Sequence, residues 1–128
     1  MGPGAKREEE IHSYRDLEVW KRSMELVANI YGITQAFPKE ELYGLTNQLR
    51  RAAVSVPANI AEGWGRGTTR EYIQFLRIAR GSLFELETLM NISGKLEYAK
   101  VKNQQQILQE IQEISKMLNA LVKSLRQK

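Results

Sequence analysis

Six arginines between residues 50 and 80 are the side chains of this sequence best suited to binding chemistry. The same stretch holds two acids, Glu62 and Glu71, and no lysine. Guanidinium groups make bidentate hydrogen bonds to phosphate and stack on flat rings, whereas a lysine is a solvated point charge. The sequence therefore predicts a nucleic-acid-binding surface formed by Arg50, Arg51, Arg66, Arg70, Arg77 and Arg80. The alternative is an ordinary solvated helix face.

The remaining basic residues add less to this prediction. The chain carries a net charge of +4 with a pI near 9.4, which by itself says little about a partner. From Lys95 to the end of the chain the basic residues are mainly lysines. None of these C-terminal cations is assigned to the binding surface.

Residues for catalysis are scarce. His12 is the only histidine and the chain has no cysteine, which argues against Ser-His-Asp and Cys-His nucleophiles and against thiolate zinc sites. The paired Glu-x-x-His repeats of di-iron bundles are also absent. Four carboxylates could bind an oxygen-preferring metal, but they are more typical of helix-surface charges: Glu85, Glu87, Glu110 and Glu113. We expect no enzymatic activity, no metal and no cofactor.

Length and composition indicate one globular domain. The chain has 128 residues, 42% of them hydrophobic, enough to bury a core without metals or disulfides. No apolar run approaches the roughly 20 residues that cross a bilayer, and residues 1–13 lack the apolar stretch of a secretion signal. We expect a flexible lead over residues 1–13, a single domain over residues 14–128, no membrane partner and a cytoplasmic location.

Four segments show the apolar spacing of amphipathic helices, over residues 16–37, 42–64, 68–93 and 100–125. Asp16 is the expected N-cap of the first helix, and Thr68 or Thr69 that of the third, where Thr68 and Glu71 fit a capping box. Gly94 is an expected C-terminal stop. Short connections between the segments predict an all-α, antiparallel up-down-up-down four-helix bundle. Pro57 lies inside the second segment and removes a backbone donor, so we expect a kink there. The alternative is a true break at Val56.

The first helix carries two apolar stripes. One stripe contains Leu17, Trp20, Met24, Val27, Ala28 and Tyr31, and the other contains Val19, Leu26, Ile30, Ile33 and Phe37. A bundle helix needs only one stripe to reach its own core. We therefore expect the second stripe to contact another subunit, with an oligomer interface at Val19, Leu26, Ile30 and Ile33. The alternative is a helix buried centrally in one monomer.

A polar ridge runs beside the core stripe of the second helix, formed by Gln48, Ser55, Asn59 and Glu62. Buried polar groups must be paired, so we expect a structural hydrogen-bonded network that includes Arg51 or Arg80. The alternative is that the ridge lines the nucleic-acid surface. Trp64 in the following glycine-rich turn is expected to cap the end of the bundle, or else to stack on a base or a partner.

Several segments together resemble the 23S rRNA intervening-sequence protein family, also called the four helix bundle family. They are LEVW at residues 17–20, FP at 37–38, ELYGL at 41–45, QLRRAAVSVPANIAEG at 48–63 and FLRIARGSLFELE at 75–87. The resemblance implies a left-handed antiparallel bundle that forms a ring-like homopentamer, linked to large-subunit rRNA genes with an inserted segment. It also marks residues 50–63 as functional or interface positions.

A related branch of the family comprises the accessory variability determinant proteins of diversity-generating retroelements. Their pentamers bind RNA or DNA and work with a reverse transcriptase. The sequence as a whole favours a basic, homo-oligomeric bundle that binds nucleic acid, with RNA ahead of DNA. The resemblance implies that the oligomer is a pentamer. The alternative is a scaffold that docks a reverse transcriptase.

Overall fold

The computed structural model describes residues 11–127, which form an all-α protein. Its elements are η2 (Tyr14–Asp16), α1 (Glu18–Thr34), η3 (Lys39–Glu41), α2 (Leu45–Trp64), α3 (Thr69–Lys95) and α4 (Val101–Arg126). Within the described part of the chain there is no β-strand. The prediction of an all-α chain with four main helices is therefore confirmed, while residues 1–10 of the expected lead lie outside the described residues.

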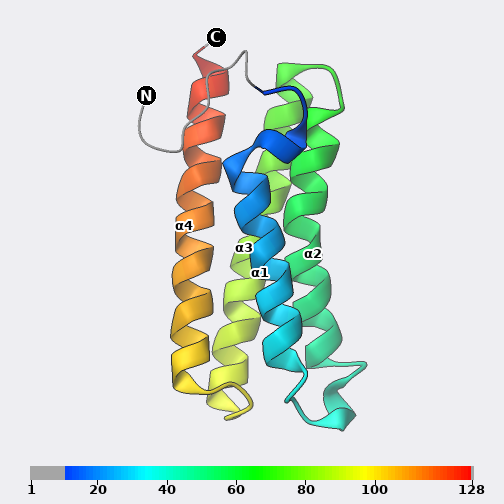
Figure 1. Cartoon of the computed structure of the whole chain (residues 1–128), viewed down its shortest axis with the longest axis vertical. Coiled ribbons are helices and arrows are strands. Elements are labelled where there is room, and N and C mark those ends of the chain that lie inside the picture. The colour runs from blue at the N-terminus through cyan, green and yellow to red at the C-terminus, as the bar shows by residue number, and fades with distance from the viewer. Residues whose placement is uncertain (1–10, 128) are drawn as a thin grey trace.

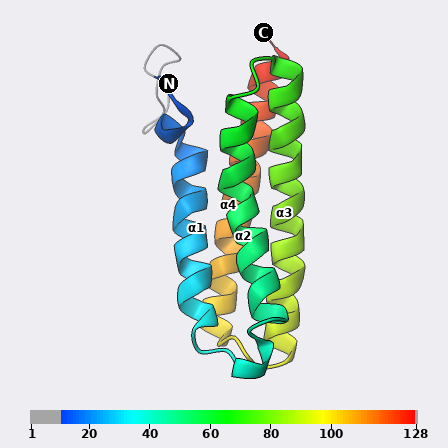
Figure 2. The same ribbon diagram turned by 90° about the vertical axis from the view of Figure 1, so that its right-hand side faces the viewer.

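The four helices lie side by side as a long bundle (Figure 1). The colour gradient in Figure 1 descends along α1 and α3 and ascends along α2 and α4. Each helix packs on two neighbours, since α2 contacts α1 and α3, and α4 contacts the same two helices from the other side. Figure 2 shows α2 in front, between α1 and α3, with α4 behind. The beginning of α3 therefore lies beside the end of α4.

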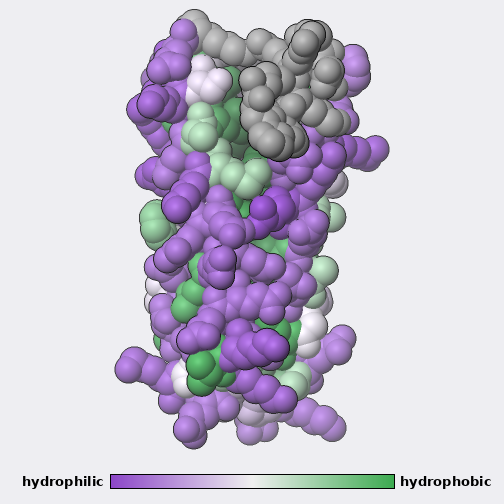
Figure 3. Space-filling model, turned by 60° about the vertical axis from the view of Figure 1, so that its left-hand side comes forward, coloured by the Kyte–Doolittle hydropathy of each residue, from purple (hydrophilic) through white to green (hydrophobic). Residues whose placement is uncertain are grey.

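Hydrophilic side chains cover most of the side that carries α4. Figure 3 shows this side, where hydrophobic residues appear as separate patches rather than one broad area. The described residues contain no helix that is long and apolar enough to cross a membrane.

The first helix begins differently from the expectation at Asp16. The Asp16 carboxylate accepts hydrogen bonds from the backbone N–H groups of His12 (2.9 Å) and Ser13 (3.1 Å). Ser13 is the N-cap of the short η2 turn, and α1 starts after Leu17 without a side-chain cap. Asp16 thus closes a capping box on η2 instead of capping α1. Ser13, together with Ile11, which packs against the core, belongs to the folded part although it was assigned to the lead.

The core of the bundle contains the α1 stripe that was expected at a subunit interface. Leu26 and Ile30 have no exposed surface, Val19 is buried and Ile33 is half-buried against the core. Residues without exposed surface cannot contact another subunit, so the interface predicted at Leu26 and Ile30 is wrong, and Val19 is buried as well. A contact at Ile33, which keeps part of its surface exposed, stays a prediction. The exposed members of the other stripe are Met24, Ala28 and Tyr31.

Two buried hydroxyl residues explain why the inward stripe of α1 was misassigned. Ser23 and Thr34 lie on the core side, and each donates to a backbone carbonyl of its own helix at 2.7 Å, to Val19 and to Ile30. These bonds remove the cost of burying a hydroxyl. Ser23 and Thr34 can therefore lie on the buried face of α1, although their hydroxyl groups make that face look more polar in the sequence.

Helix α2 is continuous from Leu45 to Trp64, with Pro57 inside it and buried. The alternative of a break at Val56 is therefore wrong, while a bend at Pro57 stays a prediction. Leu42 was expected in the core stripe but is 46% exposed, because α2 begins only at Leu45. Leu45 and Leu49 are buried as expected.

The turn from α2 to α3 holds these two helices in close contact. A Cβ atom at Gly63 would lie 2.8 Å from the Cβ of Phe75, closer than real side chains approach. Gly67 has a φ of +94°, which glycine adopts without strain. Trp64 is half-buried, and its ring meets Tyr72 edge-on at 6.1 Å between centroids. This contact supports the interpretation of Trp64 as a cap on the bundle end.

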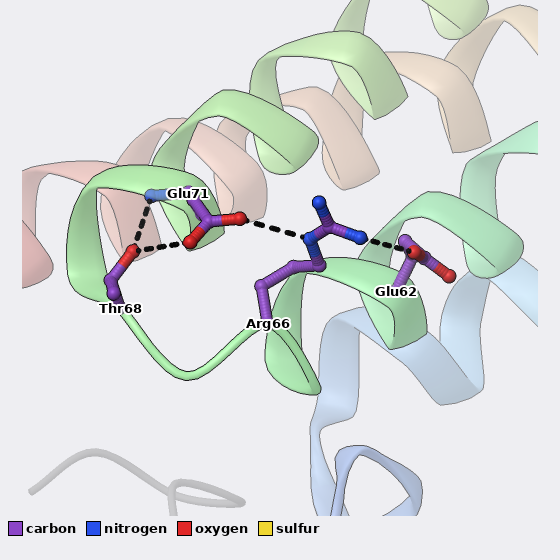
Figure 4. Close-up of polar contacts among 4 residues, drawn as sticks. All are labelled: Glu62, Arg66, Thr68 and Glu71. Carbon is purple, nitrogen blue, oxygen red and sulfur yellow. Dashed lines mark hydrogen bonds and ion pairs between the residues drawn. The ribbon is translucent and has the colours of Figure 1, made fainter.

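Arg66 bridges the same turn (Figure 4). Its guanidinium donates to Glu62 at 3.2 Å and to Glu71 at 3.0 Å, and it lies 5.2 Å from the centre of the Phe75 ring. Thr68 accepts from the backbone N–H of Glu71 at 3.2 Å, which confirms Thr68 as the N-cap of α3. The stop expected at Gly94 is displaced, since α3 runs to Lys95 and the left-handed residue is Glu97, with φ of 61°.

Two carboxylates at the α1–α4 seam have opposite surroundings. Glu110 accepts from Asn29 Nδ2 at 2.8 Å, but its second oxygen is buried with no partner among the described residues. Burial raises the pKa of Glu110 above its ordinary value of 4.5. Glu113 accepts a hydrogen bond from Arg22, and this bond lowers the pKa of Glu113 below 4.5.

We expect Gly63→Ala to destabilise the bundle by about 1–3 kcal/mol, because the added methyl group forces α2 and α3 apart in a packed core. Gly32→Ala is the matched control, since a Cβ there meets nothing within 4 Å. The control should stabilise α1 by up to about 1 kcal/mol through helix propensity. Urea unfolding followed by circular dichroism measures both changes. Unchanged stability of Gly63→Ala would contradict the close contact.

We expect Glu110→Gln and Glu113→Gln to change the pH dependence of stability in opposite directions. The raised pKa of Glu110 favours the protonated form in the folded state, so its stabilising contribution is present at low pH and lost as pH rises through the folded pKa. Relative to wild type, Glu110→Gln should therefore gain stability as pH rises above 4.5.

The lowered pKa of Glu113 has the reverse effect. Its contribution is present above the unfolded value of 4.5 and is lost as pH falls through the folded pKa. Glu113→Gln should therefore be less stable than wild type near pH 7 and approach wild type in acid. Denaturant unfolding at a series of pH values measures both variants, and parallel curves for the two would refute this assignment.

Candidate nucleic-acid interface

The six arginines of the predicted surface do not form one surface. Arg50 and Arg51 lie on the first turns of α2, Arg66 lies in the turn between α2 and α3, and the remaining three lie on the first half of α3. Because α2 and α3 run in opposite directions, the start of α2 and the start of α3 lie at opposite ends of the bundle (Figure 1). The arginines of α2 are therefore far along the bundle from Arg66 and Arg70. The prediction that all six arginines share one surface is therefore wrong.

Arg50 and Arg66 are held in structural contacts away from the groove between α3 and α4. Arg66 binds both acids of the arginine-rich stretch, and the hydrogen bond to Glu71 is the main cause that raises the pKa of Arg66. Arg50 donates through Nε to Thr34 Oγ1 at 3.0 Å and stacks on the Tyr31 ring at 4.6 Å. These contacts make Arg66 a clamp across the turn and fix Arg50 against α1.

Arg77 and Arg80 line a groove between α3 and α4. The groove encloses about 360 Å³, and its floor is apolar, with Leu76 and Leu118 buried. Arg80 Nη1 donates to Asn119 Oδ1 at 2.8 Å, so one contact spans the two helices. The opposite rim carries Lys123 and Arg126.

The cations of this groove have no acidic partner in the part of the chain that the structure describes. Among residues 11–127, ion pairs to carboxylates involve Lys21, Arg22 and Arg66, and none of the groove cations. Sequence reasoning missed Lys123 and Arg126 because they lie more than forty residues after Arg80. Their place in the last turn of α4, beside the start of α3, was the signal that could have found them.

A second hollow continues the basic surface on α3. Arg70, Gln74, Arg77 and Ile78 line about 380 Å³, and Arg77 contributes to both hollows. We call the set of unpaired cations that follows α3 and the end of α4 the basic strip, defined as Arg70, Arg77, Arg80, Lys123 and Arg126.

Arg51 belongs to a different groove on α1 and α2. This groove of about 550 Å³ is mainly apolar and is lined by Tyr31, Leu42, Tyr43, Asn47, Arg50, Arg51, Val54 and Ser55. Tyr43 is 91% exposed, so its ring is covered by almost nothing in the monomer. We call this groove the α1–α2 groove. It lies toward the end of the bundle opposite the Arg66 clamp.

The polar ridge of α2 forms a smaller network than expected. Ser55 Oγ lies 2.8 Å from Ser82 Oγ on α3, and Asn59 Nδ2 donates to both the carbonyl and the hydroxyl of Ser55 at 2.8 Å. Gln48 is exposed, and Glu62 binds Arg66 instead. The expected participation of Arg51 or Arg80 is wrong, because Arg80 bonds to Asn119 on α4.

The described residues hold no group of three or more His, Asp or Glu side chains that could bind a metal ion. Glu110 and Glu113, which the sequence offered as possible metal ligands, bind Asn29 and Arg22. The geometry at the basic strip supplies donors and positive charge, which suits the binding of anionic groups.

Comparison with known proteins agrees with this architecture. The chain is similar to a crystal structure of a protein of unknown function from the S23 ribosomal protein family of Bacteroides thetaiotaomicron. The TM-score is 0.76 at 24% identity, covering 82% of this chain and 98% of that one, and this likeness shows the shared fold. No curated protein matches the chain. The family model described as 23S rRNA-intervening sequence protein matches residues 15–120, and the chain therefore belongs to the 23S rRNA-intervening sequence protein family.

Proposed function

We propose that this protein is a non-enzymatic homo-oligomer that binds nucleic acid through the basic strip, with RNA as the first candidate ligand and DNA as the second. The observation that carries the proposal is the groove between α3 and α4, where four cations from two helices line one groove and pair with no carboxylate among residues 11–127. Like charges repel one another when they gather. A ligand that supplies several negative charges relieves this repulsion and releases its own counterions on binding.

The choice of RNA rests on family membership. The family description names an intervening sequence of 23S rRNA, which is an RNA-coding element. The strip itself offers guanidinium and ammonium donors, and these contact phosphate in any nucleic acid. Several copies of the strip in one oligomer would raise the affinity by avidity.

The oligomer needs a surface other than the inward stripe of α1. The α1–α2 groove is the candidate, since Tyr31, Leu42, Tyr43 and Val54 are large hydrophobic residues exposed close together. The outer side of α3 exposes Phe84 and Ile92, on another face of the bundle. A contact between two different faces is heterologous, and it forms a ring when the rotation between neighbouring subunits closes. The homopentamer implied by the family resemblance is such a ring.

A second candidate function is a scaffold that docks a reverse transcriptase. The same α1–α2 groove favours it, because exposed tyrosine and arginine side chains are the residues that dominate protein–protein binding energy. In this case the groove stays open in the purified oligomer and the enzyme covers it. A partner that is retained after nuclease treatment of a cell extract would support the scaffold over the nucleic-acid binder.

We expect the double variant Arg70→Glu with Arg77→Glu to weaken RNA binding strongly and to lower the salt dependence, since each lost phosphate contact reduces the slope of log K against log salt by about 1. Lys39→Glu with Lys95→Glu is the control with the same change in charge, because both lysines are exposed at the other end of the bundle. Fluorescence anisotropy with labelled RNA measures the affinities. Equal losses in both variants would refute the assigned surface.

We expect Tyr43→Asp with Leu42→Asp to reduce the oligomer toward monomer, because the change places two charges in the α1–α2 groove. Neither side chain is buried in the monomer, so the helical content and the melting temperature should change little. Met24→Asp on exposed α1 surface is the control. Light scattering gives the mass. A monomeric wild-type protein at micromolar concentration would end the oligomer proposal, and an unchanged oligomer in the double variant would exclude this groove.

A further inference from the structure

We infer that the groove between α3 and α4 holds a single strand of nucleic acid by its phosphates, with RNA and DNA strands bound alike. The inference rests on the proposed function and names the class of ligand for the same site. It concerns whether the groove takes single or double strands and whether the groove itself distinguishes ribose from deoxyribose. The ranking of RNA ahead of DNA in the proposed function comes from the family description and not from the groove.

Cations line the groove from both of its helices. Arg77 and Arg80 come from α3, while Lys123 and Arg126 come from α4. In each pair the two residues are three positions apart, so each rim carries its charges about 4.5 Å apart along the helix axis. A ligand that satisfies both rims must bring negative charge to two sides of the slot at once.

The slot is narrow because its walls are neighbouring packed helices. Axes of packed helices lie about 8–10 Å apart, and the buried Leu76 and Leu118 form the floor. A duplex is stiff, with a persistence length of about 50 nm, and presents a convex surface. It can contact one rim but cannot enter the slot. A flexible single strand can bend into the slot and contact both rims.

The lining offers little with which to recognise a base. It contains no aromatic side chain, and aromatic rings are the usual stacking platforms of single-strand binders. Its one amide, Asn119, already accepts a hydrogen bond from Arg80 through Oδ1 at 2.8 Å. The donors that remain are cationic and suit phosphate oxygens. Affinity should therefore depend weakly on base sequence.

The lining also offers no carboxylate acceptor for a ribose hydroxyl. Recognition of RNA over DNA depends on the 2′-OH, which acts as donor and acceptor. Every charged side chain of the slot is a donor, and the Asn119 oxygen is engaged with Arg80. RNA and DNA strands therefore present the same usable groups to this groove, the phosphates.

The number of cations sets the expected salt dependence. A single strand that contacts four cations loses affinity with a slope of log K against log salt of about −3 per occupied groove, using about −0.7 for each phosphate. Removal of two of the four cations should reduce this slope by about half. An anionic ligand held at one rim would show the smaller slope from the start.

The test uses fluorescence anisotropy on the full-length protein with four labelled probes of equal length: oligo-U, oligo-dT, a blunt DNA duplex and polyglutamate. We expect oligo-U and oligo-dT to bind within about threefold of each other, and the duplex and polyglutamate at least tenfold more weakly. The variant Arg80→Gln with Lys123→Gln should lose at least tenfold affinity for both single strands and about half of the salt slope. Lys39→Gln with Lys95→Gln is the matched control and should bind as the wild type does.

The outcomes separate the inference from the proposed function. If the duplex binds as tightly as the single strands, or oligo-U binds far more tightly than oligo-dT, the inference is wrong while nucleic-acid binding stands. Equal affinity for polyglutamate would mean that the groove takes an acidic protein. If no nucleic acid binds at low salt, the proposed function fails and the inference fails with it. Circular dichroism melting and light scattering confirm that each variant keeps the fold and the mass.

Discussion

The close contact of α2 and α3 at Gly63 is the constraint from which the rest of the surface follows. The absence of a side chain at Gly63 lets Phe75 approach its backbone, and the chain reverses direction within the few residues between the two helices. Helix α3 then begins at the end of the bundle where α4 ends (Figures 1 and 2). Two basic segments that are far apart in sequence become the two rims of one groove. A larger residue at this position would change the packing of α3 and with it the width of the groove.

The distribution of acids gives that groove its charge. Both acids of the stretch from residue 50 to 80 bind the same arginine, Arg66 (Figure 4). The ion pairs close the turn, and the arginines of α3 form no ion pair with any carboxylate that the structure describes. Arg80 makes its hydrogen bond to a neutral amide, which orients the guanidinium without cancelling its charge. A single clamp thus stabilises the turn and preserves the positive potential of the neighbouring helix face.

Local features of the sequence were sufficient for the helices and some of their ends. The 3.6-residue spacing predicted all four helices, and Thr68 with Glu71 predicted the start of α3, because capping depends on residues a turn apart. The inward face of α1 was not predictable in the same way. Its buried Ser23 and Thr34 bond to their own helix, and two apolar stripes of similar strength do not say which one meets a neighbour. The expected interface at Leu26 and Ile30 failed for this reason.

The sequence by itself determined that the chain is an all-α bundle, that it belongs to its family, and that arginine concentrates in one part of it. The tertiary structure decided which cations act together. It separated Arg50 and Arg51 from the others, assigned Arg66 to a clamp, and brought Lys123 and Arg126 beside Arg77 and Arg80. The physical reason is that helix formation and capping depend on neighbours along the chain, whereas charge at a surface depends on which helices pack side by side and on where each acid finds its partner.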